Sequence, residues 1–232
     1  MSFLRYANTI MTAIDAAIEF AENPEPRCPC VLLLDTSMSM QGEPIDALNA
    51  GVRLFCDELQ KDSVASRRVE VAVISFNTII EVVQPFVSAS HFQPPKLTVQ
   101  GFTNMGSAID RALDLIQERK TLYRASGIAY YRPWVLMVTD GEPHGEADHV
   151  IQNAARRIRE YEEDKRLAFF AVGVQNASMQ KLAKIAVRPP IQLSGLNFQD
   201  MFVWLSTSMQ LVSRSRVDEQ IPLPPPGAVA AH

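Results

Sequence analysis

The sequence predicts a doubly wound α/β domain with a mostly parallel central sheet, one antiparallel edge strand and helices on both faces. Short apolar runs rich in β-branched residues alternate along the chain with longer segments whose apolar residues recur every three or four positions. Strands that alternate with helices build parallel sheets, because each helix carries the chain back to the edge where the next strand starts. A tight turn at Asn77-Thr78 joins two strands directly, so those two must be antiparallel.

The apolar run Val31 to Leu34 predicts a first strand at residues 30–35, buried on both faces. A helix is expected from Gly42-Glu43-Pro44 to about Lys61, because proline favours the first helical turn. The same criteria predict strands at 69–76, 79–87, 134–139, 167–174 and 191–193, and helices at 107–125, 146–164, 178–186 and 198–214.

The two ends of the chain fall outside this pattern, and the predicted division is 1–27, 28–217 and 218–232. Residues 2–22 predict an amphipathic helix that packs on its own domain or docks on another chain. Its apolar stripe comprises Leu4, Ala7, Met11, Ile14, Ile18 and Ala21. The proline-rich stretch from Ile221 to Gly227 cannot continue a helix, so this tail is expected to be extended or disordered. A solvated terminus is the simpler interpretation, and a ligand for a proline-binding module is the alternative.

Composition excludes several classes of partner and compartment. The 232 residues are 47% hydrophobic, with a net charge of −4 and a pI near 5.6, which does not favour nucleic acid or an anionic membrane surface. Three cysteines argue against a disulfide framework, and Cys28-Pro29-Cys30 lacks a second pair of metal ligands, so it is interpreted as the start of a strand. No membrane span or secretory signal is evident, and a cytoplasmic protein is predicted.

Oxygen-bearing side chains follow two predicted strands and precede one predicted helix. Asp35, Ser37 and Ser39 leave the first strand, Asp140 follows the strand at 134–139, and Thr103 lies in a loop that leads into a helix. Sites in such sheets lie beyond the carboxyl ends of the strands, so these segments are expected to meet there. Carboxylate and hydroxyl oxygens suit a hard cation, and the prediction is Mg²⁺, with Mn²⁺ or Ca²⁺ as alternatives.

This set of residues resembles the von Willebrand factor A (VWA) domain and its metal-ion-dependent adhesion site. The family pattern is Asp-x-Ser-x-Ser after the first strand, a later Thr and an Asp after the fourth strand, and all five positions match here. The resemblance covers about residues 28–215 and implies a Rossmann-like fold with no enzymatic activity. It also implies that the hydroxyls bind the metal directly, that Asp35 and Asp140 act through water or orient the hydroxyls, and that a partner's Asp or Glu completes the coordination.

Within the family, the sequence motifs are similar to those of bacterial tellurium-resistance proteins of the TerY type. Val31 to Ser37, Gly42 to Ile45 and Asp140 to Pro143 carry this likeness. It implies a stress-response system whose protein kinase or PP2C-like phosphatase is the partner. Self-association through the exposed metal is a further expectation.

Two other functions are compatible with parts of the pattern. A Mg²⁺-dependent phosphohydrolase of the haloacid dehalogenase type also places an Asp after the first strand, but it usually needs a second Asp where Ser37 stands. A scaffold that acts through the N-terminal helix is the other alternative. Met38, Met40 and Met105 flank the ligand loops, and the hypothesis is an apolar collar around the ion, with inward packing of some of these side chains as the alternative. His144 is interpreted as a loop or cap residue.

Overall fold

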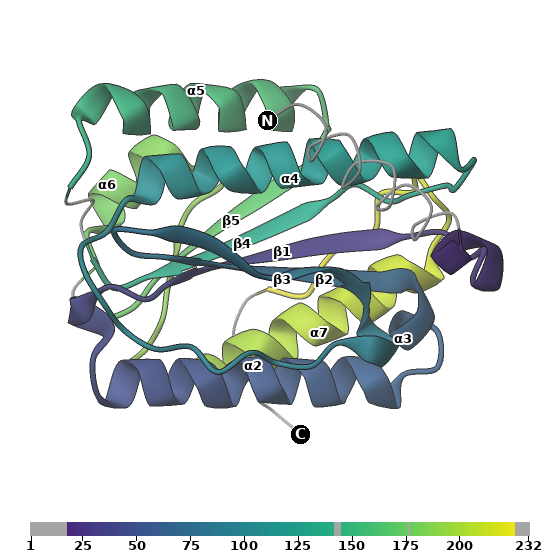
Figure 1. The fold of residues 1–232 in the computed structure, drawn as a ribbon, viewed down its shortest axis with the longest axis horizontal. Coiled ribbons are helices and arrows are strands. Elements are labelled where there is room, and N and C mark those ends of the chain that lie inside the picture. The colour runs from purple at the N-terminus through teal and green to yellow at the C-terminus, as the bar shows by residue number, and fades with distance from the viewer. Residues whose placement is uncertain (1–17, 142–144, 176, 226–232) are drawn as a thin grey trace, which may run out of the picture.

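The computed structural model describes residues 18–141, 145–175 and 177–225. Six strands form one sheet in the order β3-β2-β1-β4-β5-β6 (Figure 1). All neighbouring strands are parallel except β2 and β3, which are antiparallel and place β3 at an edge. The predicted doubly wound sheet with one antiparallel edge strand is therefore confirmed. The strands are β1 Cys28–Asp35, β2 Val69–Phe76, β3 Ile80–Ser88, β4 Trp134–Thr139, β5 Ala168–Gly173 and β6 Ile191–Gln192.

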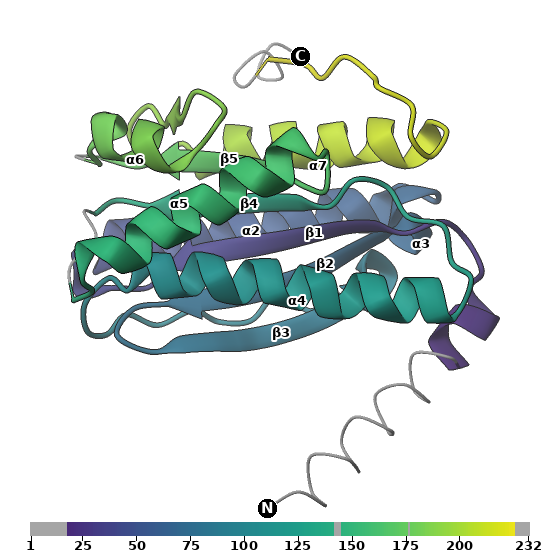
Figure 2. The same ribbon diagram turned by 90° about the horizontal axis from the view of Figure 1, so that it is seen from above.

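The helices cover both faces of the sheet (Figure 2). In chain order they are α2 Glu43–Lys61, α3 Ala65–Arg68, α4 Met105–Ala125, α5 Asp148–Glu163, α6 Met179–Ile185 and α7 Phe198–Arg214. Side chains of α2 and α7 pack with Leu32 and Leu34 in one core, and side chains of α4, α5 and α6 pack with Val31 and Leu33 in the other. Alternate residues of β1 thus enter opposite cores, which explains why this strand is a continuous apolar run.

The two helices on the first face approach each other closely at a glycine. A β-carbon on Gly51 of α2 would lie 2.4 Å from the Phe202 ring of α7. Phe202 in turn lies 5.8 Å, between ring centroids, from Phe55 of α2. A residue without a side chain is therefore needed at this crossing.

The structure adds short elements that the sequence did not predict. Met38–Met40 and Ala89–His91 form single 3₁₀ turns, and α3 fills the connection between α2 and β2. The three cysteines are free and buried, and Cys28 and Cys30 lie in β1, as expected of a strand start without a disulfide. Across the described part of the chain, no helix combines the length and the apolar character that crossing a bilayer requires.

Only the end of the predicted N-terminal helix, residues 18–22, lies within the described residues, and it is helical. Its contacts differ from the predicted stripe, since Ile18 is 55% exposed and Ala21 is exposed, while Phe20 is buried. Phe20 packs on the guanidinium groups of Arg27 and Arg119, 5.3 and 4.8 Å from its ring centroid. The ring contacts of Phe20 and an ion pair between Glu19 and Arg119, rather than the apolar stripe, therefore hold this end of the segment.

Candidate metal centre

The candidate site lies at the carboxyl-end edge of the sheet, where β1 and β4 stop side by side. These strands are parallel neighbours, with Leu34 opposite Val138, so Asp35 and Asp140 leave the sheet at nearly the same level. The third segment is the loop that carries Thr103, which leads into α4 at Met105. Three chain segments therefore meet at one edge, as the sequence predicted.

A chain of hydrogen bonds joins the residues that follow β1 and β4. Asp35 Oδ1 accepts from the backbone N–H of Ser37 at 2.8 Å, and Asp35 Oδ2 accepts from Thr139 Oγ1 at 2.6 Å. The hydroxyls of Ser37 and Ser39 are 2.9 Å apart. Ser39 Oγ donates to Asp140 Oδ1 at 2.8 Å. The structure thus brings four of the five predicted site residues into one bonded network.

The fifth residue, Thr103, faces the same space. A β-carbon on Gly141 would lie 3.6 Å from Ser39 Oγ and 3.7 Å from Thr103 Oγ1. It would also lie 4.0 Å from Asp35 Oδ2. Oxygens from all three loops therefore surround a point beside Gly141, where a glycine leaves the space between them open.

Burial makes the two carboxyl groups hard to ionise. Asp35 is fully buried, and this raises its pKa from 3.8 to about 6, with hydrogen bonds from Ser37 and Thr139 acting in the opposite direction. The charge of nearby Asp140 adds to the increase. Burial also raises the pKa of Asp140, and the hydrogen bond from Ser39 lowers it. A divalent cation between the loops would offset the cost of holding both carboxylates ionised.

The donor set fits a hard, oxygen-preferring cation. Three hydroxyls and two carboxylates converge, and among the described residues neither sulfur nor imidazole takes part. Within the described ranges, no three His, Cys, Asp or Glu side chains gather into a group that could hold a metal. The candidate site therefore depends on its three hydroxyls as direct ligands. Neutral oxygen ligands of this kind suit Mg²⁺, which retains several waters.

Backbone pairing holds the Thr103 loop against the end of β1. The N–H of Gln100 donates to the carbonyl of Thr36 at 2.8 Å, and the N–H of Met38 donates to the carbonyl of Gly101 at 3.2 Å. Asn77 fixes the Thr36 side chain, donating from Nδ2 to Thr36 Oγ1 at 2.9 Å. These contacts join loops distant in sequence, and no sequence spacing signalled them.

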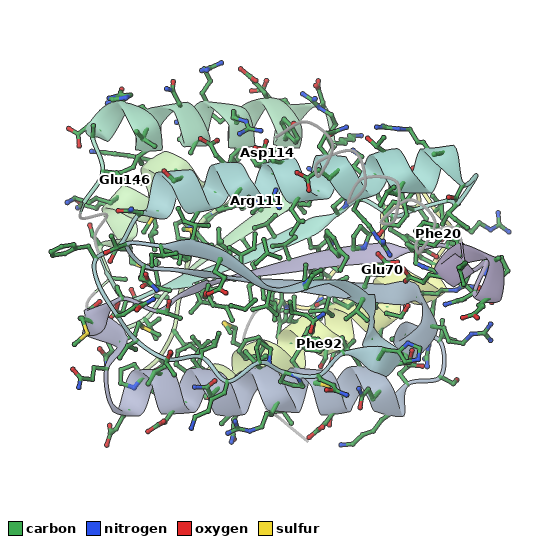
Figure 3. All side chains as sticks on the ribbon, in the orientation of Figure 1. Phe20, Glu70, Phe92, Arg111, Asp114 and Glu146 are labelled. Atoms are coloured by element: carbon green, nitrogen blue, oxygen red, sulfur yellow. The ribbon has the colours of Figure 1, made fainter. Side chains whose placement is uncertain are left out.

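Glu146 links the Asp140 loop to the start of α4. Its carboxylate accepts from the N–H groups of Gly106 at 2.7 Å and Ser107 at 3.0 Å, while Asn104 at the N-cap makes no side-chain cap bond (Figure 3). A carboxylate at a helix N-terminus satisfies unpaired N–H groups and the positive end of the helix dipole. Because Thr103 precedes α4 directly, Glu146 holds two of the three site loops together. This role was not predicted.

The expected methionine collar is wrong for two of its three members. Met38 is 50% exposed between the two serines, but Met40 and Met105 are fully buried in the two cores. The 3₁₀ turn points Met40 inward, and Met105 begins the buried face of α4. His144 lies outside the described residues.

Two other apolar side chains are exposed beside the site. Phe102, next to Thr103, is 65% exposed, and Ile79 in the β2–β3 turn is 59% exposed. Thr78 connects them, because its hydroxyl accepts from the N–H of Phe102 at 2.8 Å. We call the surface formed by Met38, Ile79 and Phe102 the apolar rim.

The family model for the von Willebrand factor type A domain matches residues 30–202, about three quarters of the chain. The chain belongs to this family. The match includes all five residues of the candidate site. A search of curated proteins gave no match.

Several solved structures share the VWA fold. The vWF domain of the type V pili tip protein Mfa5 from Porphyromonas gingivalis is 11% identical, with a TM-score of 0.63, over 83% of this chain and 98% of that one. The pilus adhesin SpaC from Lactobacillus rhamnosus GG is 14% identical with a TM-score of 0.64. The ArnB paralog VWA2 from Sulfolobus acidocaldarius is 16% identical with a TM-score of 0.51.

These likenesses concern the fold. Each of the three aligned regions covers at least 80% of this VWA chain, but only 30% of SpaC and 44% of the ArnB paralog. This chain therefore spans less than half the length of those two proteins.

Proposed function

We propose that this VWA domain binds partner proteins through a divalent cation, Mg²⁺ before Mn²⁺ or Ca²⁺. The observation that supports this most strongly is the convergence of five oxygen-bearing side chains from three loops on the space beside Gly141. The hydroxyls of Ser37, Ser39 and Thr103 would ligate the ion. Asp35 would orient Ser37 through its N–H, and Asp140 would orient Ser39 through its hydroxyl.

Such an ion keeps coordination positions for an outside ligand. Two carboxylates balance its charge, but the neutral hydroxyls contact it directly, so the ion remains attractive to a further anion. A partner's Asp or Glu can replace a water there. Binding would then require both the metal and an exposed carboxylate on the partner.

The apolar rim adds a second element of recognition to this proposal. Met38, Ile79 and Phe102 expose apolar surface on the loops that surround the site. Exposed apolar side chains that gather at a polar site are typical of interaction surfaces. We therefore expect the partner's acidic residue to be flanked by bulky apolar residues.

The proposed biological setting is inferred from the sequence motifs that resemble those of TerY-type proteins. We propose a cytoplasmic role in a bacterial stress response of the tellurium-resistance type, with a kinase or PP2C-like phosphatase of the same system as partner. The chain's own acidic residues offer a further carboxylate source, so self-association belongs to the same proposal.

A haloacid-dehalogenase-type phosphohydrolase is the alternative from another class of function. The place of its second Asp is taken by Ser37, which is buried and hydrogen-bonded to Ser39. A hydroxyl cannot serve as the acid at neutral pH. Hydrolysis of p-nitrophenyl phosphate that is lost in Asp35→Asn would favour the enzyme over the binding module.

Isothermal titration of metal-free protein with Mg²⁺ tests the proposal. We expect one site in the intact chain and at least about tenfold weaker binding in Thr103→Ala, because a direct ligand is removed. Ser90→Ala removes an exposed hydroxyl in the turn that follows β3 and is the matched control. Equal Mg²⁺ affinity in the intact chain and Thr103→Ala would contradict the ligand assignment.

A further inference from the structure

Three buried aromatic side chains pack together on the α7 side of the sheet, next to a second candidate binding surface. Trp134 of β4 and Phe170 of β5 lie 4.8 Å apart between ring centroids, and Trp204 of α7 lies 5.6 Å from Phe170. Trp134 and Trp204 are the two tryptophans of the whole chain. We call the surface that Trp134, Phe170 and their neighbours line the tail groove.

The tail groove contains a cavity of about 700 Å³ that is open to solvent on one side. Trp134 and Phe170 line it from the sheet, and the segment after α7 lines it from outside. Its charged lining residues are Arg132, Lys165 and Arg188 on one side and Asp218 and Glu219 on the other. Arg188 also lies 5.2 Å from the Phe170 ring centroid. The groove thus combines an aromatic floor with basic side chains on its sheet side and acidic ones on its tail side.

The chain's own tail occupies the outer side of this groove. A turn after α7 is closed by two bonds between Arg216 and Glu219, at 3.0 Å between backbone groups and 2.8 Å to the Glu219 carboxylate. The following residues run back along α7 (Figure 2). Trp204 Nε1 then donates to the carbonyl of Pro224 at 2.7 Å. The tail is therefore extended and attached at a defined point.

Proline-rich chains suit such a groove for physical reasons. A proline lacks an N–H, so its segment offers mainly carbonyl acceptors, and an indole N–H is the complementary donor. Polyproline II segments are extended before they bind and lose little conformational entropy. The half-buried side chains of Ile221 and Leu223 add apolar contact at alternate positions.

The tail covers the groove without filling it. Ile221, Leu223 and Pro224 are all partly exposed, and the cavity lies between them and the sheet. Because its side chains are only partly buried, such a segment is expected to open at a lower free-energy cost than the core elements. The bound tail can therefore exchange with a similar segment from outside.

We propose that the tail groove is a binding site for extended proline-rich segments of a partner protein, which the chain's own residues 221–225 occupy in competition. This surface shares no residue with the metal site, although β4 contributes to both, so the proposal stands without the proposed function. It gives the domain a second interaction surface that recognises apolar and proline residues rather than carboxylates.

The test uses the full chain and a fluorescent peptide that copies residues 219–225. In a tail-release variant, Ile221→Ser/Leu223→Ser, the chain's own tail no longer competes. A short tether gives the tail an effective concentration on the order of 1 mM, so we expect the variant to bind the peptide about tenfold more tightly than the intact chain. Tryptophan emission should shift on binding, because Trp134 lines the groove and the Trp204 indole N–H donates to the tail. Leu211→Ser, an exposed change elsewhere on α7, is the control.

Two further measurements keep the result specific. Trp204→Phe in the tail-release background keeps a ring but removes the indole N–H, and peptide affinity should fall several-fold while the circular dichroism spectrum stays unchanged. A peptide with its prolines replaced by alanine should bind more weakly. The proposal is overturned if tail release leaves peptide affinity unchanged, or if the alanine peptide binds the variant as tightly as the proline peptide.

Discussion

The substitution Asp35→Asn separates the cost of the buried carboxylate from its use in metal binding. Asparagine has the same shape, and its oxygen can still accept the bond from the N–H of Ser37. Its amide can face Thr139, whose hydroxyl is able to accept as well as donate. The substitution therefore removes the charge with little change in packing.

The pKa of Asp35 gives the size of the effect. Burial raises it from 3.8 to about 6, and about 1.4 kcal/mol per pKa unit converts this difference to about 3 kcal/mol above neutral pH. Because the folded-state pKa is raised, the penalty is absent below 3.8 and develops as pH increases through about 6. Without metal at about pH 7.5, Asp35→Asn should therefore be more stable than the intact chain, by up to about 3 kcal/mol.

Metal should reverse this order. At a Mg²⁺ concentration of one thousand times Kd, the intact chain gains about 4.1 kcal/mol, which exceeds the advantage of the metal-free variant, and the variant gains much less. Urea unfolding in EDTA and in Mg²⁺, at about pH 7.5 and pH 4.5, measures all four free energies. Asp46→Asn, an exposed change in the first turn of α2, is the control. A metal-free Asp35→Asn that is less stable than the intact chain by more than about 1 kcal/mol would refute the reasoning.

Three further substitutions test the supports of the fold and the site. Glu146→Ala removes the carboxylate at the start of α4, and we expect about 1 kcal/mol lower stability by urea unfolding and several-fold weaker Mg²⁺ binding by calorimetry. Glu70→Gln leaves two buried arginines without their shared carboxylate and should cost about 3–5 kcal/mol in the same unfolding assay. Gly51→Ala forces a methyl against Phe202 and should lower the free energy of unfolding by about 1–3 kcal/mol.

For each of these three substitutions, a specific result would contradict the prediction. Glu160→Ala, an exposed change on α5, is the matched control for the first, and equal Mg²⁺ affinity in the two variants would remove Glu146 from the site. A loss below about 1 kcal/mol in Glu70→Gln would mean that water replaces the carboxylate. An unchanged midpoint in Gly51→Ala would mean that α7 can move away from α2.

The strand pattern could be predicted because burial on both faces leaves a direct trace in sequence. β4 has the predicted bounds, residues 134–139, and the Asn77-Thr78 turn produces the expected antiparallel pair. The meeting of Asp35 with Asp140 follows from the parallel arrangement of the strands they end. The division into residues 1–27, 28–217 and 218–232 stays a prediction, as do the metal and the partner.

Side-chain direction in loops could not be predicted in the same way. Met38 and Met40 are two residues apart, yet a single 3₁₀ turn exposes the first and buries the second. A loop has no fixed periodicity, so its sequence does not reveal which residues point inward. Hydrogen bonds between residues distant in sequence present the same difficulty. Glu146 accepts a hydrogen bond from the N–H of Gly106, which lies 40 positions earlier in the chain.

The buried charges at the opposite end of the sheet show a further limit. Glu70 accepts from Arg27 and from Arg119, at 2.9 and 2.7 Å, and also from Tyr123 (Figure 3). In the sequence, Glu70 is one charged residue in a β-branched strand, and nothing marks it as fully buried. Its partners come from α4 and from the residue before β1, so only the folded chain reveals the cluster.

The most direct test of the central claim is the anomalous diffraction signal of Mn²⁺ in crystals of the intact chain. We expect one strong peak beside Gly141, about 2.1 Å from the hydroxyl oxygens of Ser37, Ser39 and Thr103. That result would establish the ion between the three loops. A peak elsewhere, or none at a Mn²⁺ concentration that saturates binding in solution, would contradict the metal site and leave the domain to act through another surface.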